Sequence, residues 1–143
     1  MKISGGCFCG GIRYDADIDE NRVAVCHCRD CQVFSGSAFR MACPAAPSSF
    51  GFTKGEPRHF DKTADSGKVR RMAFCGDCGT HLCSLPVGPG ADSGFVSLRI
   101  ATADNFHKIQ PVREIFGDSR VPWLSPIATL AQFPGMPKPP TND

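Results

Sequence analysis

The sequence Val69-Arg70-Arg71-Met72-Ala73-Phe74-Cys75-Gly76-Asp77-Cys78-Gly79-Thr80-His81-Leu82 places two cysteines in a tight turn between two strand-like runs. Strands are expected over residues 69–74 and 81–87, on either side of that turn. A C-x-x-C turn between two strands is typical of a zinc-ribbon knuckle, because both sulfurs can face one point. Gly79 lies where a positive φ would let backbone amides face sulfur, a conformation that glycine adopts at little cost. This stretch therefore predicts a metal-binding β-hairpin.

Two other groups of cysteines lie nearer the N-terminus. Cys7 and Cys9 form a C-x-C pair, and Cys26-His27-Cys28-Arg29-Asp30-Cys31 holds three cysteines within six residues. Disulfides explain these groups poorly, because the total of 9 cysteines is odd and grouped thiols are too close in sequence for ordinary bridges. Closely spaced thiols chelate metals well, so seven of the nine are predicted to be metal ligands.

The seven ligands divide most naturally as four plus three. Structural zinc takes four protein ligands in a tetrahedron, whereas catalytic zinc takes three and leaves one position open. The two pairs would form the closed site and the triple the open one, which gives two zinc ions per chain. Two alternatives remain: the triple could take one sulfur from a pair, or His27 could be its fourth ligand. The other two cysteines, Cys43 and Cys83, are expected to be small buried residues.

Size and composition indicate one ordinary globular domain over residues 1–143. Apolar residues make up 41% and charged residues 21% of the chain, which argues against disorder. A net charge of +2, evenly spread, argues against a nucleic-acid surface. No apolar run approaches the roughly 20 residues that a membrane span needs, and no signal segment opens the chain, so a cytoplasmic protein is expected.

Alternation of apolar and polar residues predicts a chain of short, mostly antiparallel strands. Strands are expected over 12–18, 23–25, 38–42, 49–53, 58–60, 69–74, 81–87, 95–101 and 112–116. Lys54-Gly55-Glu56-Pro57 is expected to close a hairpin between two of them. The tail from Pro122 is proline-rich and irregular, so any helix there is confined to about 127–132, and Trp123 is expected in the core.

Several motifs together resemble the family of glutathione-dependent formaldehyde-activating enzymes and centromere protein V. The motifs are Gly5-Gly6-Cys7-x-Cys9-Gly10, Cys26-His27-Cys28-x-x-Cys31-Gln32, Ser35-Gly36-Ser37, Phe74-Cys75-x-x-Cys78-Gly79-Thr80, Glu114-Ile115-Phe116, Ser119, Pro122-Trp123 and Phe133-Pro134-Gly135-Met136-Pro137. The resemblance implies an all-β, Mss4-like fold of small antiparallel sheets, in a tent or sandwich arrangement with zinc-ribbon-type knuckles. It also implies a structural zinc at Cys7, Cys9, Cys75 and Cys78 and a catalytic zinc at Cys26, Cys28 and Cys31.

The implied activity is that of a zinc-dependent carbon-sulfur lyase or synthase that acts on thiol adducts. In the founding reaction of the family, glutathione and formaldehyde combine into S-hydroxymethylglutathione, so a small-molecule thiol such as glutathione is the expected partner. Two alternatives belong to other classes: a non-catalytic zinc module that binds a protein, and a thiol redox sensor. The sequence shows no obvious anchoring cluster for the carboxylates of glutathione.

Polar residues near the cysteines are weaker candidates for a role. Arg29, Asp30 and Gln32 flank the open site and could orient it or offset its negative charge. His27 could shuttle a proton, but it is expected to hydrogen-bond the backbone. Arg70 and Arg71 could balance the charge of four thiolates or could lie on a solvated strand face. No catalytic residue beyond the metal ligands, and no cofactor-binding residue other than those ligands, is assigned from the sequence.

Overall fold

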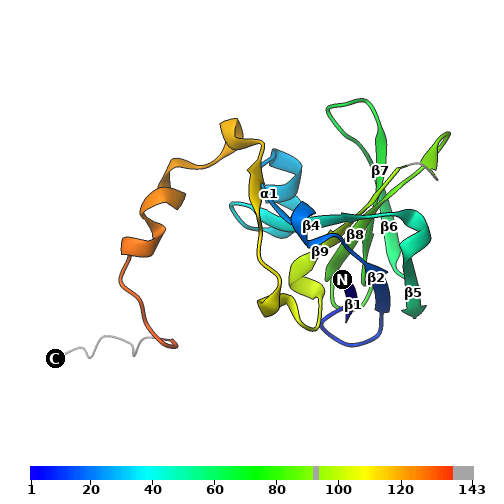
Figure 1. Ribbon diagram of the computed structural model, residues 1–143, viewed down its shortest axis with the longest axis horizontal. Helices are drawn as coiled ribbons and strands as arrows, with labels where there is room; N and C mark the ends of the chain where they lie inside the picture. Colours follow the sequence, from blue (N-terminus) through cyan, green and yellow to red (C-terminus); the bar gives the residue numbers. More distant parts are fainter. Residues whose placement is uncertain (92–93, 137–143) are drawn as a thin grey trace.

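The computed structural model describes residues 1–91 and 94–136, which form two β-sheets and one α-helix (Figure 1). The strands are β1 Lys2–Gly6, β2 Arg13–Asp17, β3 Ala24–Cys26, β4 Arg40–Ala45, β5 Phe50–Lys54, β6 Arg58–Thr63, β7 Val69–Phe74, β8 His81–Pro86, β9 Val96–Arg99 and β10 Arg113–Ile115. The helix α1 spans Arg29–Ser35, and short 3-10 helices span Glu20–Arg22, Pro47–Ser49, Ile100–Thr102, Phe106–Lys108, Gly117–Ser119 and Pro122–Thr129.

The strands divide into a three-stranded sheet and a seven-stranded sheet. The smaller sheet has the order β1-β2-β5, and the larger has the order β10-β3-β4-β9-β8-β7-β6. Every pairing between these strands is antiparallel except that of β10 with β3, which is parallel. The all-β fold that the sequence predicts is therefore confirmed.

Three local predictions are wrong or incomplete. β5 and β6 do not form a hairpin, because β5 pairs with β2 in one sheet and β6 with β7 in the other. The helix α1 was not expected, because seven residues are too short to show a helical period. The strand β1 was also not expected, and its Gly5 is required by packing: a Cβ there would lie 2.4 Å from the hydroxyl of Tyr14.

The tail differs from its prediction as well. A 3-10 helix spans Pro122–Thr129, so the helical segment begins earlier than the expected 127–132 and is not an α-helix. Figure 1 shows this segment, in orange, running away from the sheets. Trp123 is 56% exposed and therefore does not belong to the core. The end of the tail, including Pro137, lies outside the described residues. No helix in the described part of the chain is both long enough and apolar enough to span a membrane.

The two sheets share one hydrophobic core. Tyr14 of β2 and Leu98 of β9 are fully buried in the same cluster, although they belong to different sheets. Cys43 and Cys83 lie opposite Leu98 on the neighbouring strands, so this face of the larger sheet points into the core. Both cysteines are buried, as predicted.

Truncating Leu98 tests this core. Leu98→Ala is expected to lower the free energy of unfolding by about 2–5 kcal/mol, because a fully buried leucine leaves a cavity when it is shortened. Leu130→Ala is the matched control, since Leu130 is 61% exposed and its truncation should change stability by less than about 0.5 kcal/mol. Urea unfolding followed by circular dichroism measures both, and equal losses for the two variants would contradict this description of the core.

Candidate metal centres

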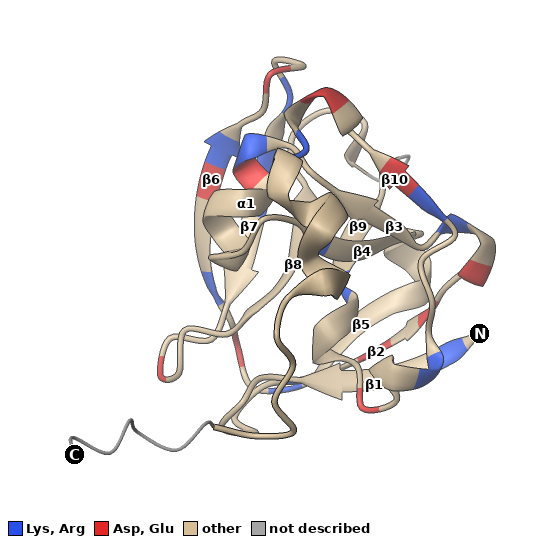
Figure 2. Ribbon diagram, turned by 90° about the vertical axis from the view of Figure 1, so that its left-hand side faces the viewer, with Lys and Arg blue, Asp and Glu red and all other residues tan. Residues whose placement is uncertain are grey.

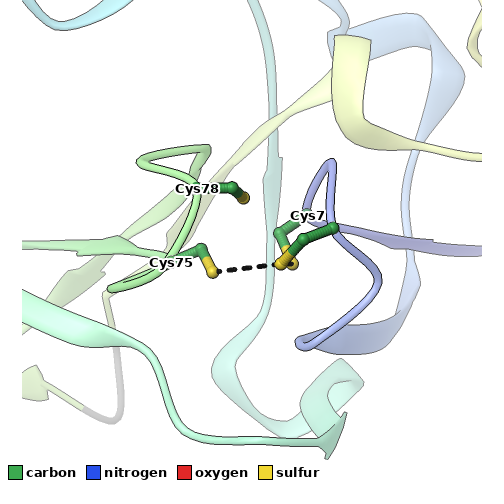
Figure 3. Close-up of side chains that lie close together, drawn as sticks. Cys7, Cys75 and Cys78 are labelled. Carbon is green, nitrogen blue, oxygen red and sulfur yellow. Dashed lines mark hydrogen bonds between the residues drawn. The ribbon is translucent and has the colours of Figure 1, made fainter.

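Two turns from different sheets bring four cysteines together. Cys7 and Cys9 follow β1 of the smaller sheet, and Cys75 and Cys78 follow β7 of the larger one. The four sulfur atoms all lie within 4.8 Å of one another. Figure 3 shows Cys75 and Cys78 on one turn, facing the turn that carries Cys7. The cluster therefore joins the two sheets at residues that are far apart in the sequence.

The two turns are built alike. Gly10 follows the first cysteine pair and Gly79 follows the second, and each has a φ of 72°. The positive φ predicted for Gly79 is thus confirmed, and glycine adopts this left-handed conformation without a Cβ penalty. The amide of Ile12 donates a hydrogen bond to Cys7 Sγ at 3.1 Å. The hydroxyl of Thr80 lies 3.2 Å from Cys78 Sγ, and this contact lowers the pKa of Cys78 to about 5.

A second cluster contains the other three grouped cysteines. Cys26 ends β3, Cys28 is the N-cap of α1, and Cys31 lies in the first turn of that helix. Their sulfur atoms are 3.6 Å apart for Cys26 and Cys28, and 3.2 Å apart for each of the other two pairs. The hydrogen bond donated by Cys31 lowers the pKa of Cys26 to about 5, and the same contact raises the pKa of Cys31.

The neighbouring polar residues have partners away from the sulfurs. The imidazole of His27 is not in the cluster: it is 1% exposed, lies against Phe39, and has its Nε2 3.4 Å from Glu114 Oε2. Its backbone amide donates a hydrogen bond to Ile115 O at 3.1 Å, whereas neither ring nitrogen has a hydrogen-bond partner among the described residues. Asp30 pairs with Lys62 at 2.8 Å, and Gln32 donates to two backbone carbonyls, those of residues 38 and 119.

Both clusters fit a zinc ion by the chemistry of their donors. A tetrahedral zinc with bonds of about 2.3 Å to sulfur places its sulfurs about 3.8 Å apart. The measured separations of 3.5 and 3.7 Å in the four-cysteine cluster are close to this value. Those of the three-cysteine cluster, from 3.2 to 3.6 Å, are slightly shorter. All these cysteines are free thiols. The seven residues thus form the groups of four and three that the sequence predicts, while the binding of zinc by these groups stays a prediction.

A pocket adjoins the three-cysteine cluster. It encloses about 500 Å³, within the range of small-molecule sites, and Cys26, Cys28 and Cys31 all line it. A metal held by these three sulfurs would have one tetrahedral position unfilled, and that position would be open to a ligand in this pocket.

Sequence reasoning missed the cations of this pocket. Arg70 lines the pocket, whereas Arg71 pairs with Asp61 at 2.7 Å, so neither balances the four-cysteine cluster. Arg40 also lines it, and no sequence motif marks this residue. The pairing of β3 with β4 places Arg40 directly opposite Cys26, and that register could not be inferred from the spacing of cysteines.

The sequence profile of the family described as "Glutathione-dependent formaldehyde-activating enzyme" matches residues 2–119. This chain belongs to that family. The matched residues include all seven clustered cysteines. The family membership expected from the motifs is confirmed.

Two relatives extend the comparison. A protein of Schizosaccharomyces pombe, named an uncharacterized lyase, is 34% identical over 82 residues, which cover 57% of this chain and 56% of the relative. The crystal structure of a Rhodobacter sphaeroides protein superposes with a TM-score of 0.59 at 16% identity, over 78% of this chain and 99% of that one. The second likeness concerns the fold alone.

Proposed function

We propose that the chain is one zinc-binding domain that forms or breaks a carbon-sulfur bond in adducts of a small thiol with an aldehyde. The observation that carries this proposal is the pocket of about 500 Å³ into which the three-cysteine cluster opens. Membership of the formaldehyde-activating family supports glutathione and formaldehyde as the reactants and S-hydroxymethylglutathione as the product. The free thiols of all nine cysteines suit a reducing compartment, so the cytoplasm is the proposed location.

The two clusters would have different roles. Cys7, Cys9, Cys75 and Cys78 would hold a structural zinc, because four thiolates complete its coordination. Cys26, Cys28 and Cys31 would hold a second zinc, which would supply a coordination position that lowers the pKa of an added thiol enough for it to be a thiolate at neutral pH. The chain itself fixes these three sulfurs at the end of a strand and the start of a helix, and its pocket walls hold the reactants together.

The proposed reaction balances as an addition. The thiolate sulfur donates an electron pair to the carbonyl carbon, and the π electrons of the carbonyl move to its oxygen. The oxygen then takes a proton, which replaces the one lost from the thiol, and the product is a hydroxymethyl thioether. The reverse reaction is the lyase direction, and no oxidant or reductant is needed. Holding sulfur and aldehyde in contact supplies a large part of the rate advantage.

Metal stoichiometry combined with thiol binding tests this proposal. The purified protein is expected to contain two zinc ions per chain, and an added thiol should bind one of them only. With cobalt in place of zinc, a thiol should change the sulfur-to-metal absorption bands of one site and leave the other site unaltered. One zinc per chain, or two zinc sites of which neither binds an added thiol, would indicate a purely structural zinc domain and would contradict the proposed activity.

A further inference from the structure

One face of the seven-stranded sheet carries the pocket. Cross-strand partners share a face, and Cys26 lies opposite Arg40, with their Cβ atoms about 5 Å apart by this pairing. Further along the same face, Ser97 of β9, Ser84 of β8 and Met72 of β7 are cross-strand partners in one row. All five residues line the pocket. The opposite face belongs to the apolar core, so the polar residues on this face are directed to the pocket.

Five cationic side chains line this pocket, together with a single carboxylate. The cations are Arg22, Arg40, Lys68, Arg70 and Arg113, and the carboxylate is Asp30. Asp30 already pairs with Lys62. Within the described residues, none of the five cations has a carboxylate within ion-pair distance. Figure 2 shows Lys and Arg interspersed with Asp and Glu along the ribbon, so a pocket with five cations and one carboxylate differs from the mixed charge of the chain.

The arginines are held together against their mutual repulsion. Burial and then the charge of Arg40 lower the pKa of Arg70, and the same two causes lower the pKa of Arg99 to about 9. Arg99 is 5% exposed, and its Nε has no hydrogen-bond partner among the described residues; the same is true of the buried Nε of Arg40. Unpaired buried charges are costly, and the usual remedy is an anion.

The metal site itself supplies too little negative charge to balance this cluster. Three thiolates around a zinc dication have a net charge of about −1, whereas the pocket holds five cations. Arg22, Lys68 and Arg113 are exposed to water, whereas Arg40 and Arg70 are half-buried, so these two are the cations that a ligand inside the pocket would neutralise. The walls next to them are partly apolar, with Phe95, Ile115 and Phe116 among the lining residues. Such a pocket suits a small molecule with an anionic group and an uncharged stem.

We propose that Arg40 and Arg70 form a carboxylate-binding subsite, which selects thiols that carry a carboxylate and directs their sulfur to the three-cysteine cluster. This inference rests on the proposed function, because it uses the same site for the sulfur. Arg40 lies beside the cluster and donates a hydrogen bond to Ser97 Oγ at 3.3 Å. Arg70 is fixed by hydrogen bonds to Ser84 O and Phe95 O at 2.9 and 2.8 Å. Guanidinium groups fixed in this way recognise carboxylates by paired hydrogen bonds.

Calorimetric titration of the zinc-loaded protein with three thiols of similar size tests the subsite. The thiols are 3-mercaptopropionate, which carries a carboxylate, 2-mercaptoethanol, which is neutral, and cysteamine, which carries an ammonium group. The carboxylate thiol is expected to bind at least about tenfold more tightly than the neutral one, and the ammonium thiol most weakly. Arg40→Gln and Arg70→Gln should each weaken binding of 3-mercaptopropionate by about tenfold to a hundredfold and leave that of 2-mercaptoethanol unchanged.

Arg71→Gln is the matched control, because Arg71 adjoins Arg70 in β7 but pairs with Asp61 outside the pocket. It should bind all three thiols as the unmodified protein does. Unchanged affinity for 2-mercaptoethanol also shows that a variant has folded and kept its metal. Equal affinity for the three thiols would overturn the proposed subsite. So would glutamine variants that still bind 3-mercaptopropionate more tightly than 2-mercaptoethanol by the same factor. Selective binding without any reaction with formaldehyde would uphold the subsite while contradicting the proposed function.

Discussion

Replacing Cys75 by serine is expected to leave the chain unfolded at 25 °C. Cys75 is 2% exposed and lies 3.7 Å from Cys9, in the cluster that joins the two sheets. Binding of structural zinc to small domains contributes about 10–16 kcal/mol to folding, which is comparable to the entire stability of a typical domain, about 5–15 kcal/mol. Loss of one of four ligands should therefore release the metal and remove the connection between the sheets. Circular dichroism and zinc content measure the result, and chelation of the unmodified protein should reproduce it.

Cys43→Ser is the control for this variant. Cys43 is also fully buried, but it lies in the core and not in either cluster. Its sulfur is 3.4 Å from Asp19 O, so a serine hydroxyl there keeps an acceptor. We expect a folded protein with both zinc ions and a loss of at most about 1–3 kcal/mol. A folded, two-zinc Cys75→Ser protein would show that the four-cysteine cluster is not a structural site.

Replacing Cys28 by serine is expected to abolish activity without unfolding the chain. Cys28 is the N-cap of α1, a position where serine is among the preferred residues, so the helix should keep its start. The three-cysteine cluster would lose a ligand, and its zinc would be released. Activity toward the thiol-aldehyde adduct should fall by more than about a hundredfold. Mutating residues that only hydrogen-bond to metal ligands already lowers activity or metal affinity by about 10- to 100-fold, and loss of a ligand itself should cost more.

The measurement pairs adduct formation with metal analysis. One zinc per chain, normal circular dichroism and no turnover are expected for Cys28→Ser. The Cys43→Ser protein should keep both zinc ions and full activity. A Cys28→Ser protein that holds one zinc and retains full activity would place the chemistry elsewhere in the molecule.

The sequence was most informative where chemistry depends on local spacing. The three groups of cysteines were visible as short motifs, and the structure brings them into the same groups of four and three. Strands such as β7 were predicted at their observed bounds, because alternation and the flanking turn limit them. Strand alternation also predicted the all-β class. These features depend on residues that are close together in the sequence, so they can be recognised from one sequence alone.

Features that depend on distant partners were missed. β1 contains two glycines and shows little strand propensity, and its pairing with β2 and the close approach of Gly5 to Tyr14 define it. The helix α1 begins after Cys28 and contains Cys31, and its seven residues are too few to show an apolar period. Arg40 and Arg70 of the pocket come from β4 and β7, which β9 and β8 separate in the larger sheet, and the register of these four strands places both arginines on one face. No short motif records that arrangement.

The four-cysteine cluster also sets an order of events during synthesis. Cys9 and Cys75, whose sulfurs meet in the folded protein, are 66 residues apart in the chain. A ribosome adds about 5–20 residues per second, so the first pair waits roughly 3 to 13 seconds for the second. During that interval Cys7 and Cys9 are thiols on an unfinished chain, without the two other sulfurs that complete a tetrahedral site. A structural zinc bound as proposed could therefore be captured only after Cys78 has been added, and a reducing environment would keep the first pair of thiols free until then.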